Sequence, residues 1–533
     1  MLKCTPCSSL EKIFPDKAPE AAGLSGFSLL QGEYGAFQIA LESDRIETLP
    51  IEIESALAVR CFRVDCIEAK HVCHRGDDDY LRRTPGPYPD VLKPCSLITV
   101  GGEVRALWFE IGAGDYPAGV YPVTVRLGDT ACTVQVEVIG TVLPEQTLLC
   151  THWLHTDCLS TRYGVEVFSE EYWRITENFV REAVRHGVNF ILTPLFTPPL
   201  DTAEGKERPT VQLVDVWKTG ENYSFGFDKL RRWFTMGDRC GVRAYEMSHL
   251  FTQWGAMHAP KVMAYEDGAY RQIFGWKTWA ASRKYTAFLR AFAAALRAFL
   301  AQTGMLSRCW FHISDEPSSD RIRDYARRSR LIRELFPDSP VMDALSDLAF
   351  YRRGLLPQPI PCINHAAEFY GKVPQLWTYY CCGPEDGYYP NRFMAMPSYR
   401  NRVLGMLMYK YDIRGFLQWG LNFWYSILSD HPIDPYAPGG ADESFAAGDA
   451  YVLYPGDAGE PVVSLRFKVF REGLQDQRAL ALLESRIGRE KTCALLDEAG
   501  IRAFNEYPRS AEALLALRET INRLIKETSE VSE

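Results

Sequence analysis

The chain has 533 residues, of which 47% are hydrophobic and 24% charged, as in ordinary soluble globular proteins. A chain of this length is expected to form about two to four domains. The formal net charge of −9 argues against nucleic acid and against an anionic membrane surface as partners. No apolar run is long enough to span a bilayer.

The N-terminus and the cysteines indicate a reducing compartment. Residues 1–15 contain no apolar core of a signal peptide. The fifteen cysteines are odd in number and scattered along the chain. Several lie inside predicted strands, where a free thiol acts as a small hydrophobic group: Cys132, Cys309 and Cys362. We therefore expect a cytoplasmic protein.

Residues 1–145 are predicted to form an N-terminal β-sandwich. Apolar and polar residues alternate over 123–127 and again over 132–138, as in strands with one buried face. Gly128 and Asp129 supply turn residues between these two runs. Short alternating strands with frequent turns are typical of β-sandwiches. The linker to the next domain is expected near residues 140–146.

From Leu148 onward the pattern changes to strands separated by helices, such as the helix expected over Glu170–His186. We predict an α/β fold in which residues 146–435 form a TIM-like (β/α)8 barrel. An open doubly wound sheet is the alternative. The strand candidates are Leu148–Leu154, Asn189–Leu192, Val242–Met247, Arg308–Ser314, Val341–Leu345, Cys362–His365, Gln375–Tyr380 and Gly415–Trp419.

The last part of the chain, residues 436–533, is predicted to contain a long loop and a helical region packed on the barrel. A stretch rich in proline, glycine and aspartate covers residues 430–459. Loops of this length in compact domains are usually functional or disordered. From Val463 onward the apolar residues recur with helical spacing.

Two adjacent carboxylates, Asp315 and Glu316, follow the apolar run over residues 309–313. This run is expected to form a buried strand, and enzymes with parallel sheets bind ligands at the carboxyl ends of such strands. The same residues are also typical of a helix start, where acidic side chains and proline are favoured. Ser318 and Ser319 can already cap the following helix. The context therefore favours a catalytic pair.

The ends of the other predicted strands carry histidine and aromatic residues. Carboxylates flanked by tryptophan and tyrosine suit glycoside cleavage, in which an acid protonates the leaving oxygen and aromatic faces hold the sugar. No metal-binding spacing, glycine-rich dinucleotide motif or P-loop is present, so neither a metal nor another cofactor is expected. The candidates for substrate binding are His152, His249, Trp377, Tyr379, Trp419 and Trp424.

Several segments of the chain resemble glycoside hydrolase family 123 and the related domain of unknown function 4091. The similarity covers most of the chain, including the expected order of a β-sandwich before a barrel. The longer run from Asp449 to Asp476 is the more specific mark of the family. The segments that carry the resemblance are Ser314–Pro317, Leu376–Tyr379, Gly415–Trp419, Asp449–Gly456, Ser464–Arg466 and Arg471–Asp476.

The resemblance implies a retaining β-N-acetylgalactosaminidase that acts by substrate assistance on an oligosaccharide or glycoside. The 2-acetamido oxygen of the substrate would attack the anomeric carbon. Asp315 would orient the acetamido group, and Glu316 would act as the general acid and then the general base. Tyr379 would hold the acetamido oxygen. Two neighbouring carboxylates disfavour double ionisation, which is expected to keep Glu316 protonated.

Two alternatives remain open. In the first, the chain is a two-carboxylate retaining glycosidase of the Asn-Glu-Pro type, with Glu316 as acid and base and Glu385 as nucleophile. Asp315 stands where that pattern has asparagine, which disfavours this alternative. In the second, the protein binds carbohydrate without cleaving it, because a fold does not fix a function.

Overall fold

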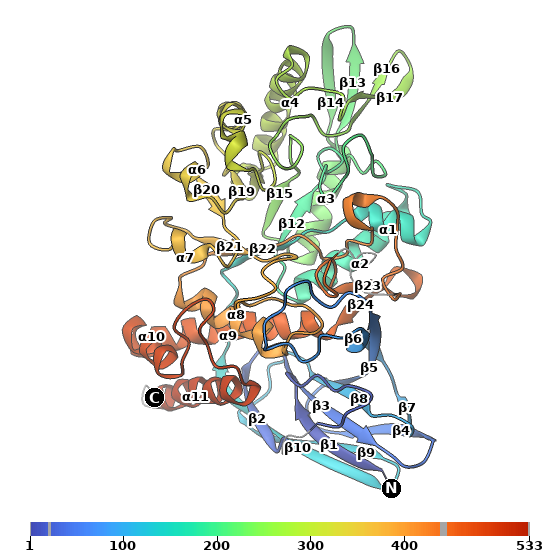
Figure 1. The fold of residues 1–533 in the computed structure, drawn as a ribbon, viewed down its shortest axis with the longest axis vertical. Helices are drawn as coiled ribbons and strands as arrows, with labels where there is room; N and C mark the ends of the chain where they lie inside the picture. The colour runs from blue at the N-terminus through green and yellow to red at the C-terminus, as the bar shows by residue number, and fades with distance from the viewer. Residues whose placement is uncertain (1, 20–22, 438–444, 531–533) are drawn as a thin grey trace.

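The structure, a computed structural model, has a mixed α/β fold and describes residues 2–19, 23–437 and 445–530 (Figure 1). Residues 438–444, which belong to the loop predicted over 430–459, lie outside the described residues. Within the described ranges, no helix is both long and apolar enough to cross a membrane.

Two sheets share the N-terminal region (blue in Figure 1). Phe37 and Phe109 of the first sheet pack in one buried core with Val123 and Val134 of the second, which belong to the two alternating runs of the sequence. The first sheet has the order β1 (Lys3–Ser8), β3 (Gly35–Glu42), β8 (Arg105–Ile111), β5 (Val59–Ala69), β6 (Gly86–Pro94), β24 (Pro461–Ser464) and β23 (Leu453–Pro455). The second has the order β2 (Gly26–Gln31), β10 (Thr130–Val142), β9 (Gly119–Leu127), β4 (Glu47–Glu54) and β7 (Leu97–Val100).

The C-terminal region, predicted as a long loop and helices, also contributes two strands to the first of these sheets. β24 pairs antiparallel with β6, so that Val463 lies opposite Leu92. Three helices follow: α9 (Leu465–Ile487), α10 (Arg489–Glu498) and α11 (Ala511–Glu530). α11 packs on the second sheet, where its Glu519 accepts a hydrogen bond of 2.6 Å from the Ser28 hydroxyl. The strand pairing could not be read from the helical periodicity of this region.

The central sheet is parallel and has the order β18 (Cys309–Phe311), β15 (Ala244–Met247), β12 (Phe190–Thr193), β11 (Leu149–His152), β22 (Gly415–Gln418) and β21 (Trp377–Tyr379). Two further parallel strands, β19 (Met342–Ala344) and β20 (Gln358–Ile360), form a separate small sheet. Single-residue parallel bridges, Phe311 to Val341 and Cys362 to Tyr379, join this pair of strands to both edges of the central sheet.

One of the eight predicted central strands was misplaced. The strand predicted over Cys362–His365 lies at Gln358–Ile360 instead. Cys362 makes only an isolated bridge, and the chain then turns because the His365 amide donates to the Cys362 carbonyl at 2.8 Å.

Helices connect the central strands, and two of them have a serine cap. Ser169 caps α2 by accepting a hydrogen bond from the Tyr172 amide, and Ser282 caps α4 in the same way. The expectation that Ser318 and Ser319 cap the helix after the carboxylate pair was wrong: Ser318 makes no capping hydrogen bond in the described part of the chain, and α5 begins only at Ile322. The helices of this region are α1 (Thr156–Tyr163), α2 (Glu170–Arg185), α3 (Asp228–Cys240), α4 (Arg283–Gln302), α5 (Ile322–Leu335), α6 (Leu348–Arg352), α7 (Ala366–Phe369) and α8 (Ser398–Lys410).

A four-stranded sheet is inserted into the loops that follow β12 and β15 and lies at the top of Figure 1. The sequence analysis did not predict this sheet. Its order is β14 (Asn222–Gly226), β13 (Asp215–Thr219), β16 (Val262–Glu266) and β17 (Ala269–Phe274).

Candidate active site

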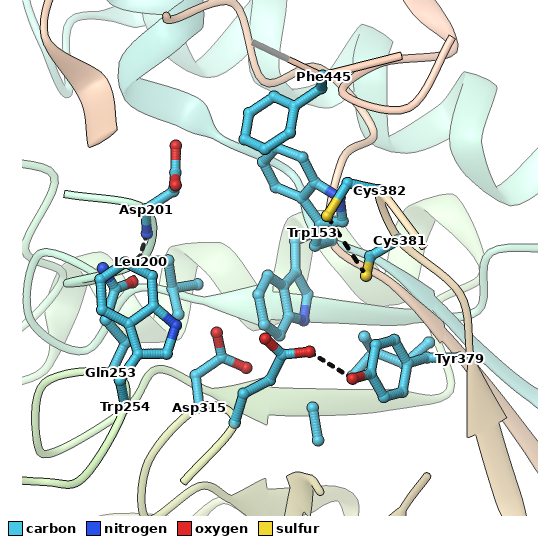
Figure 2. Close-up of a pocket in the computed structure, with 14 residues that line it drawn as sticks. Trp153, Leu200, Asp201, Gln253, Trp254, Asp315, Tyr379, Cys381, Cys382 and Phe445 are labelled. Atoms are coloured by element: carbon cyan, nitrogen blue, oxygen red, sulfur yellow. Dashed lines mark hydrogen bonds between the residues drawn. The ribbon is translucent and has the colours of Figure 1, made fainter. Parts of the chain in front are cut away.

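A pocket with about 670 Å³ of empty space lies beyond the carboxyl ends of the central strands (Figure 2). The lining combines three carboxylates with five aromatic rings and several small or apolar side chains. The lining residues are Trp153, Leu200, Asp201, Gln253, Trp254, Asp315, Glu316, Ala344, Tyr379, Cys381, Cys382, Leu417, Trp419 and Phe445.

Asp315 and Glu316 both line this pocket although they are neighbours in the chain. On a regular strand, adjacent side chains would point to opposite faces. Here β18 has already ended at Phe311, and Glu316 has a left-handed backbone with a φ of 41°. Two backbone hydrogen bonds fix this turn: the Trp254 amide donates to the Asp315 carbonyl at 2.8 Å, and the Glu316 amide donates to the Ala344 carbonyl at 3.2 Å. Such backbone strain is common at functional sites.

A buried charged histidine, His312, lies three residues before the pair. Its Nε2 is 2.6 Å from Glu246, and its Nδ1 is 3.0 Å from Asp343. Burial alone would lower the pKa of His312, but the hydrogen bonds to Asp343 and Glu246 outweigh that effect and raise the pKa to about 10. His312 is therefore an imidazolium at neutral pH, with both ring nitrogens donating.

The two carboxylates beside His312 hold parts of the pocket in place. Glu246 also accepts hydrogen bonds from the Thr151 hydroxyl at 2.6 Å and from the Trp153 indole N–H at 2.7 Å. Asp343 accepts a hydrogen bond of 2.9 Å from the Ile313 backbone amide. This network, Glu246–His312–Asp343, is fully buried. It therefore fixes both a pocket wall and the backbone that leads to the catalytic candidates.

The first carboxylate of the pair, Asp315, has a strongly raised pKa. Burial, followed by the charge of Glu316, raises the pKa of Asp315 well above its usual value, whereas the His312 cation opposes the rise. Asp315 is the more buried of the two residues, and Glu316 is the more exposed. That Glu316 carries the proton stays a prediction. Close carboxylates hold such a proton as a pair.

Tyr379 and Trp419, both expected to bind substrate, also line the pocket. The Tyr379 hydroxyl donates a hydrogen bond to Oε1 of Glu316 (Figure 2). The Trp419 indole N–H donates to the buried Asp449 at 3.1 Å, and its ring packs edge-on against Phe445. Burial raises the pKa of Asp449 to about 7. Asp449, the first residue of the most family-specific run, therefore holds an aromatic wall of the pocket.

The other four candidates for substrate binding lie behind the pocket lining. His249 stacks on His312 with ring centres 4.1 Å apart. Trp377 is buried inside the central sheet against other aromatic rings. His152 is enclosed by phenylalanine rings, and Trp424 donates its indole N–H to a backbone carbonyl in the core. None of these four is among the described residues that line the pocket.

Glu385, the nucleophile of the two-carboxylate alternative, does not line the pocket either. It accepts hydrogen bonds from the backbone amides of His74 at 2.7 Å and Arg75 at 2.8 Å. In the described part of the lining, the only carboxylate besides the neighbouring pair is Asp201. The site thus offers that alternative no nucleophile at the predicted position.

The lining residues that were not identified from the sequence include four with polar or aromatic side chains: Asp201, Gln253, Trp254 and Phe445. The first three follow β12 and β15 by several residues, so a search extended further past each strand end could have found them. Gln253 accepts a hydrogen bond of 2.6 Å from the Asp201 amide, and burial raises the pKa of Asp201 to about 6. Figure 2 shows Asp315 between Trp254 and Tyr379. Phe445 comes from the long loop and has no local signal.

Comparison with known proteins connects this pocket to a catalytic domain. A sequence profile described as glycoside hydrolase 123, catalytic domain, matches residues 153–483, which include every lining residue. The fold is similar to that of a family 123 glycoside hydrolase from Clostridium perfringens, described in work on glycolipid glycan hydrolysis, with a TM-score of 0.73 and 12% identity. That alignment covers 99% of this chain and 97% of the other.

Other similarities are weaker. An FMN-binding β-glucuronidase from Facaelibacterium prausnitzii aligns with a TM-score of 0.34 and 9% identity, over 88% of this chain and 86% of the other. A family 5 mannosidase from Rhizomucor miehei aligns with a TM-score of 0.33 and 11% identity, over 66% of this chain and 96% of the other. Scores this low carry no argument. No curated protein matches the chain.

Proposed function

The chain belongs to glycoside hydrolase family 123, and we propose that it is a retaining β-N-acetylgalactosaminidase of the β-N-acetylhexosaminidase type. The observation that carries the proposal is that Asp315 and Glu316, although consecutive, both face one pocket. A retaining enzyme with its own nucleophile needs two carboxyl groups about 5 Å apart on opposite sides of the scissile bond. Substrate assistance removes that need, because the substrate supplies the nucleophile.

In the first step, the 2-acetamido carbonyl oxygen forms a bond to the anomeric carbon. The glycosidic C–O bond breaks, and Glu316 gives its proton to the leaving oxygen. Asp315 accepts a hydrogen bond from the acetamido N–H and stabilises the positive charge of the oxazolinium. In the second step, Glu316 takes a proton from water as the water oxygen attacks the anomeric carbon. The C–O bond between the oxazolinium and the anomeric carbon breaks as the water attacks, and the product keeps its original configuration.

The electrostatics of the pair support this division of roles. Without substrate, burial and then the charge of Glu316 raise the pKa of Asp315 well above its usual value. An acetamido N–H next to Asp315 favours its ionised form. In the proposed mechanism, substrate binding therefore holds Asp315 as the carboxylate, and the first step uses a proton on Glu316. Tyr379, which donates to Glu316 in the structure, is next to this position and is proposed to hold the acetamido oxygen.

The proposal extends to the substrate and to the arrangement of the chain. Trp153 and Trp419 are proposed to form the walls against which the sugar ring packs. The Clostridium perfringens relative is described in work on glycolipid glycan hydrolysis, and we propose a glycan with a terminal N-acetylhexosamine as the substrate of this chain. We also propose a sandwich over residues 1–145, a (β/α)8-type barrel over 146–435 and a C-terminal extension over 436–533. The fifteen unpaired cysteines support a cytoplasmic location.

A panel of aryl glycosides tests the proposed function. A 2-acetamido-galactoside should be cleaved, and its 2-hydroxy counterpart should not, because the latter has no internal nucleophile. A thiazoline mimic of the cyclic intermediate should inhibit competitively. Cleavage of plain galactosides or glucosides with loss of activity in Glu385→Gln would favour the two-carboxylate alternative. Binding of sugars without any turnover would favour the non-catalytic one.

A further inference from the structure

A cluster of two histidines and one glutamate lies outside the pocket, where the segment after β5 meets the segment after β21. Its members are His71, His74 and Glu385. Each offers one ligand atom, and these atoms all lie within 4.8 Å of one another. The positions are far apart in the sequence, so the fold brings them together.

The Glu385 carboxylate has one oxygen that is held in place and one that is not. Its Oε2 is held by the backbone amides of His74 and Arg75, at 2.7 and 2.8 Å. Its Oε1 is buried and has no hydrogen-bond partner among the residues that the structure describes, and Glu385 as a whole is only 9% exposed. A buried carboxylate oxygen without a donor is costly. A cation at the cluster would remove this cost, while the two amides would orient the carboxylate as outer partners of a metal ligand.

We propose that His71, His74 and Glu385 form a site for a divalent transition metal, with zinc as the ion that the donor set fits best. Two imidazole nitrogens and one carboxylate oxygen suit zinc and disfavour magnesium or calcium, which prefer oxygen ligands alone. Ligands of a tetrahedral zinc site are about 3.4 Å apart. His74 is exposed, and its ring centre is 4.0 Å from that of His71, so the two imidazoles already lie next to each other. A water molecule would take the fourth position.

A second cluster has the same types of donor atoms but does not suit a metal ion. His249, His312 and Asp343 also have ligand atoms within 4.8 Å of one another. There, however, both nitrogens of His312 are engaged with carboxylates, and its pKa is raised to about 10. A protonated imidazole cannot ligate a metal. That cluster therefore belongs to the network beneath the catalytic pair.

The proposed ion would act as a clamp between two parts of the chain. Glu385 follows Cys381 and Cys382, which line the pocket, and the segment begins at β21, which carries Tyr379. The Tyr80 hydroxyl already donates to the Glu385 carbonyl at 2.9 Å, so this contact joins the N-terminal region to the pocket wall. The ion is expected to stabilise this junction without touching the substrate.

Zinc binding by the full-length, untagged and reduced protein tests the proposal. After removal of metals with a chelator, the protein is dialysed against zinc alone, and bound zinc is measured by elemental analysis. We expect one tightly bound equivalent in the wild type. His74→Gln should weaken its binding by more than about 100-fold, since loss of even an outer partner costs roughly 10–100-fold. His365→Gln, the same change at a histidine outside the cluster, should bind zinc like the wild type.

Cobalt substitution identifies the donor atoms. Cobalt at this site should show no thiolate charge-transfer band, because the ligands are nitrogen and oxygen. Equal zinc affinity in the wild type and His74→Gln would overturn the proposal, and so would a thiolate band, which would assign the ion to Cys73 or another cysteine. His74→Gln should hydrolyse substrate like the wild type under metal-free conditions. Because zinc content is measured without substrate, the outcome does not depend on the proposed hydrolase activity.

Discussion

Asp315→Asn tests the feature that separates substrate assistance from the two-carboxylate mechanism. The substitution nearly preserves the shape of the side chain but removes its negative charge. If Asp315 orients the acetamido group, that charge faces the positive oxazolinium as it forms. In the two-carboxylate mechanism the same change recreates the Asn-Glu-Pro pattern and should be tolerated.

The expected loss follows from the position of Asp315. Its side chain is partly buried at the pocket floor, where an effective dielectric constant of about 20 is appropriate. Two unit charges about 4 Å apart then interact by about 4 kcal/mol. Loss of this stabilisation in the transition state corresponds to a fall in kcat of roughly 1,000-fold.

The assay is steady-state hydrolysis of an aryl 2-acetamido-galactoside, with folding checked by thermal unfolding. Asp201→Asn is the matched control, because it removes the same charge from the same pocket but away from the pair. We expect it to keep most of the activity. An active Asp315→Asn together with an inactive Glu385→Gln would refute the reasoning and favour a protein nucleophile.

Three further substitutions test the acid, its partner and the buried network. Glu316→Gln should lose roughly 10²–10⁴-fold in kcat on unactivated substrates and less on those with an acidic leaving group, as measured by comparing two aglycones. Tyr379→Phe removes a hydrogen bond to a charged group, so kcat should fall roughly 10–100-fold while the fold is kept. His312 has a pKa raised to about 10 in the folded protein, so its stabilising effect is complete below pH 6.5 and is lost as the pH rises towards 10. Thermal unfolding at several pH values should show this decline in the wild type, and His312→Gln should be less stable at pH 7 and lack it.

Much of the fold could be predicted because its signals are local. The alternation of apolar and polar residues over 132–138 indicates that β10 has one buried face. The apolar run before Asp315 indicates a buried parallel strand. The strand predicted over Cys362–His365 was misplaced because short apolar runs also occur in turns. The pairing of β24 with β6 could not be predicted, since it joins residues more than 350 positions apart and depends on the whole fold.

The candidate site was predictable only where residues lie directly at strand ends. Asp315, Glu316 and Tyr379 were found by this rule, and the pocket contains all three. The rule also selected His152, whose side chain points to the opposite side from the pocket residue Trp153 because successive strand residues alternate. It selected Trp377 as well, which shares a side with Tyr379 but begins β21 and is therefore buried deeper in the sheet. The strand-end rule missed Trp254, which lies in a loop and itself has a positive φ of 59°. Loop geometry of this kind is not encoded in a local pattern.

Burial does more than the surrounding charges to raise the pKa of Asp315. It is the largest effect, and the charge of the neighbouring Glu316 adds to it. The His312 cation lowers this pKa, and its effect is larger than the opposite effect of either Asp343 or Asp201. The buried network beneath the pair is therefore not what favours a proton there; the desolvated pocket floor and the closeness of the two carboxylates are. A general acid needs a proton available near the working pH, and the position of the pair favours that condition without any contact to the substrate.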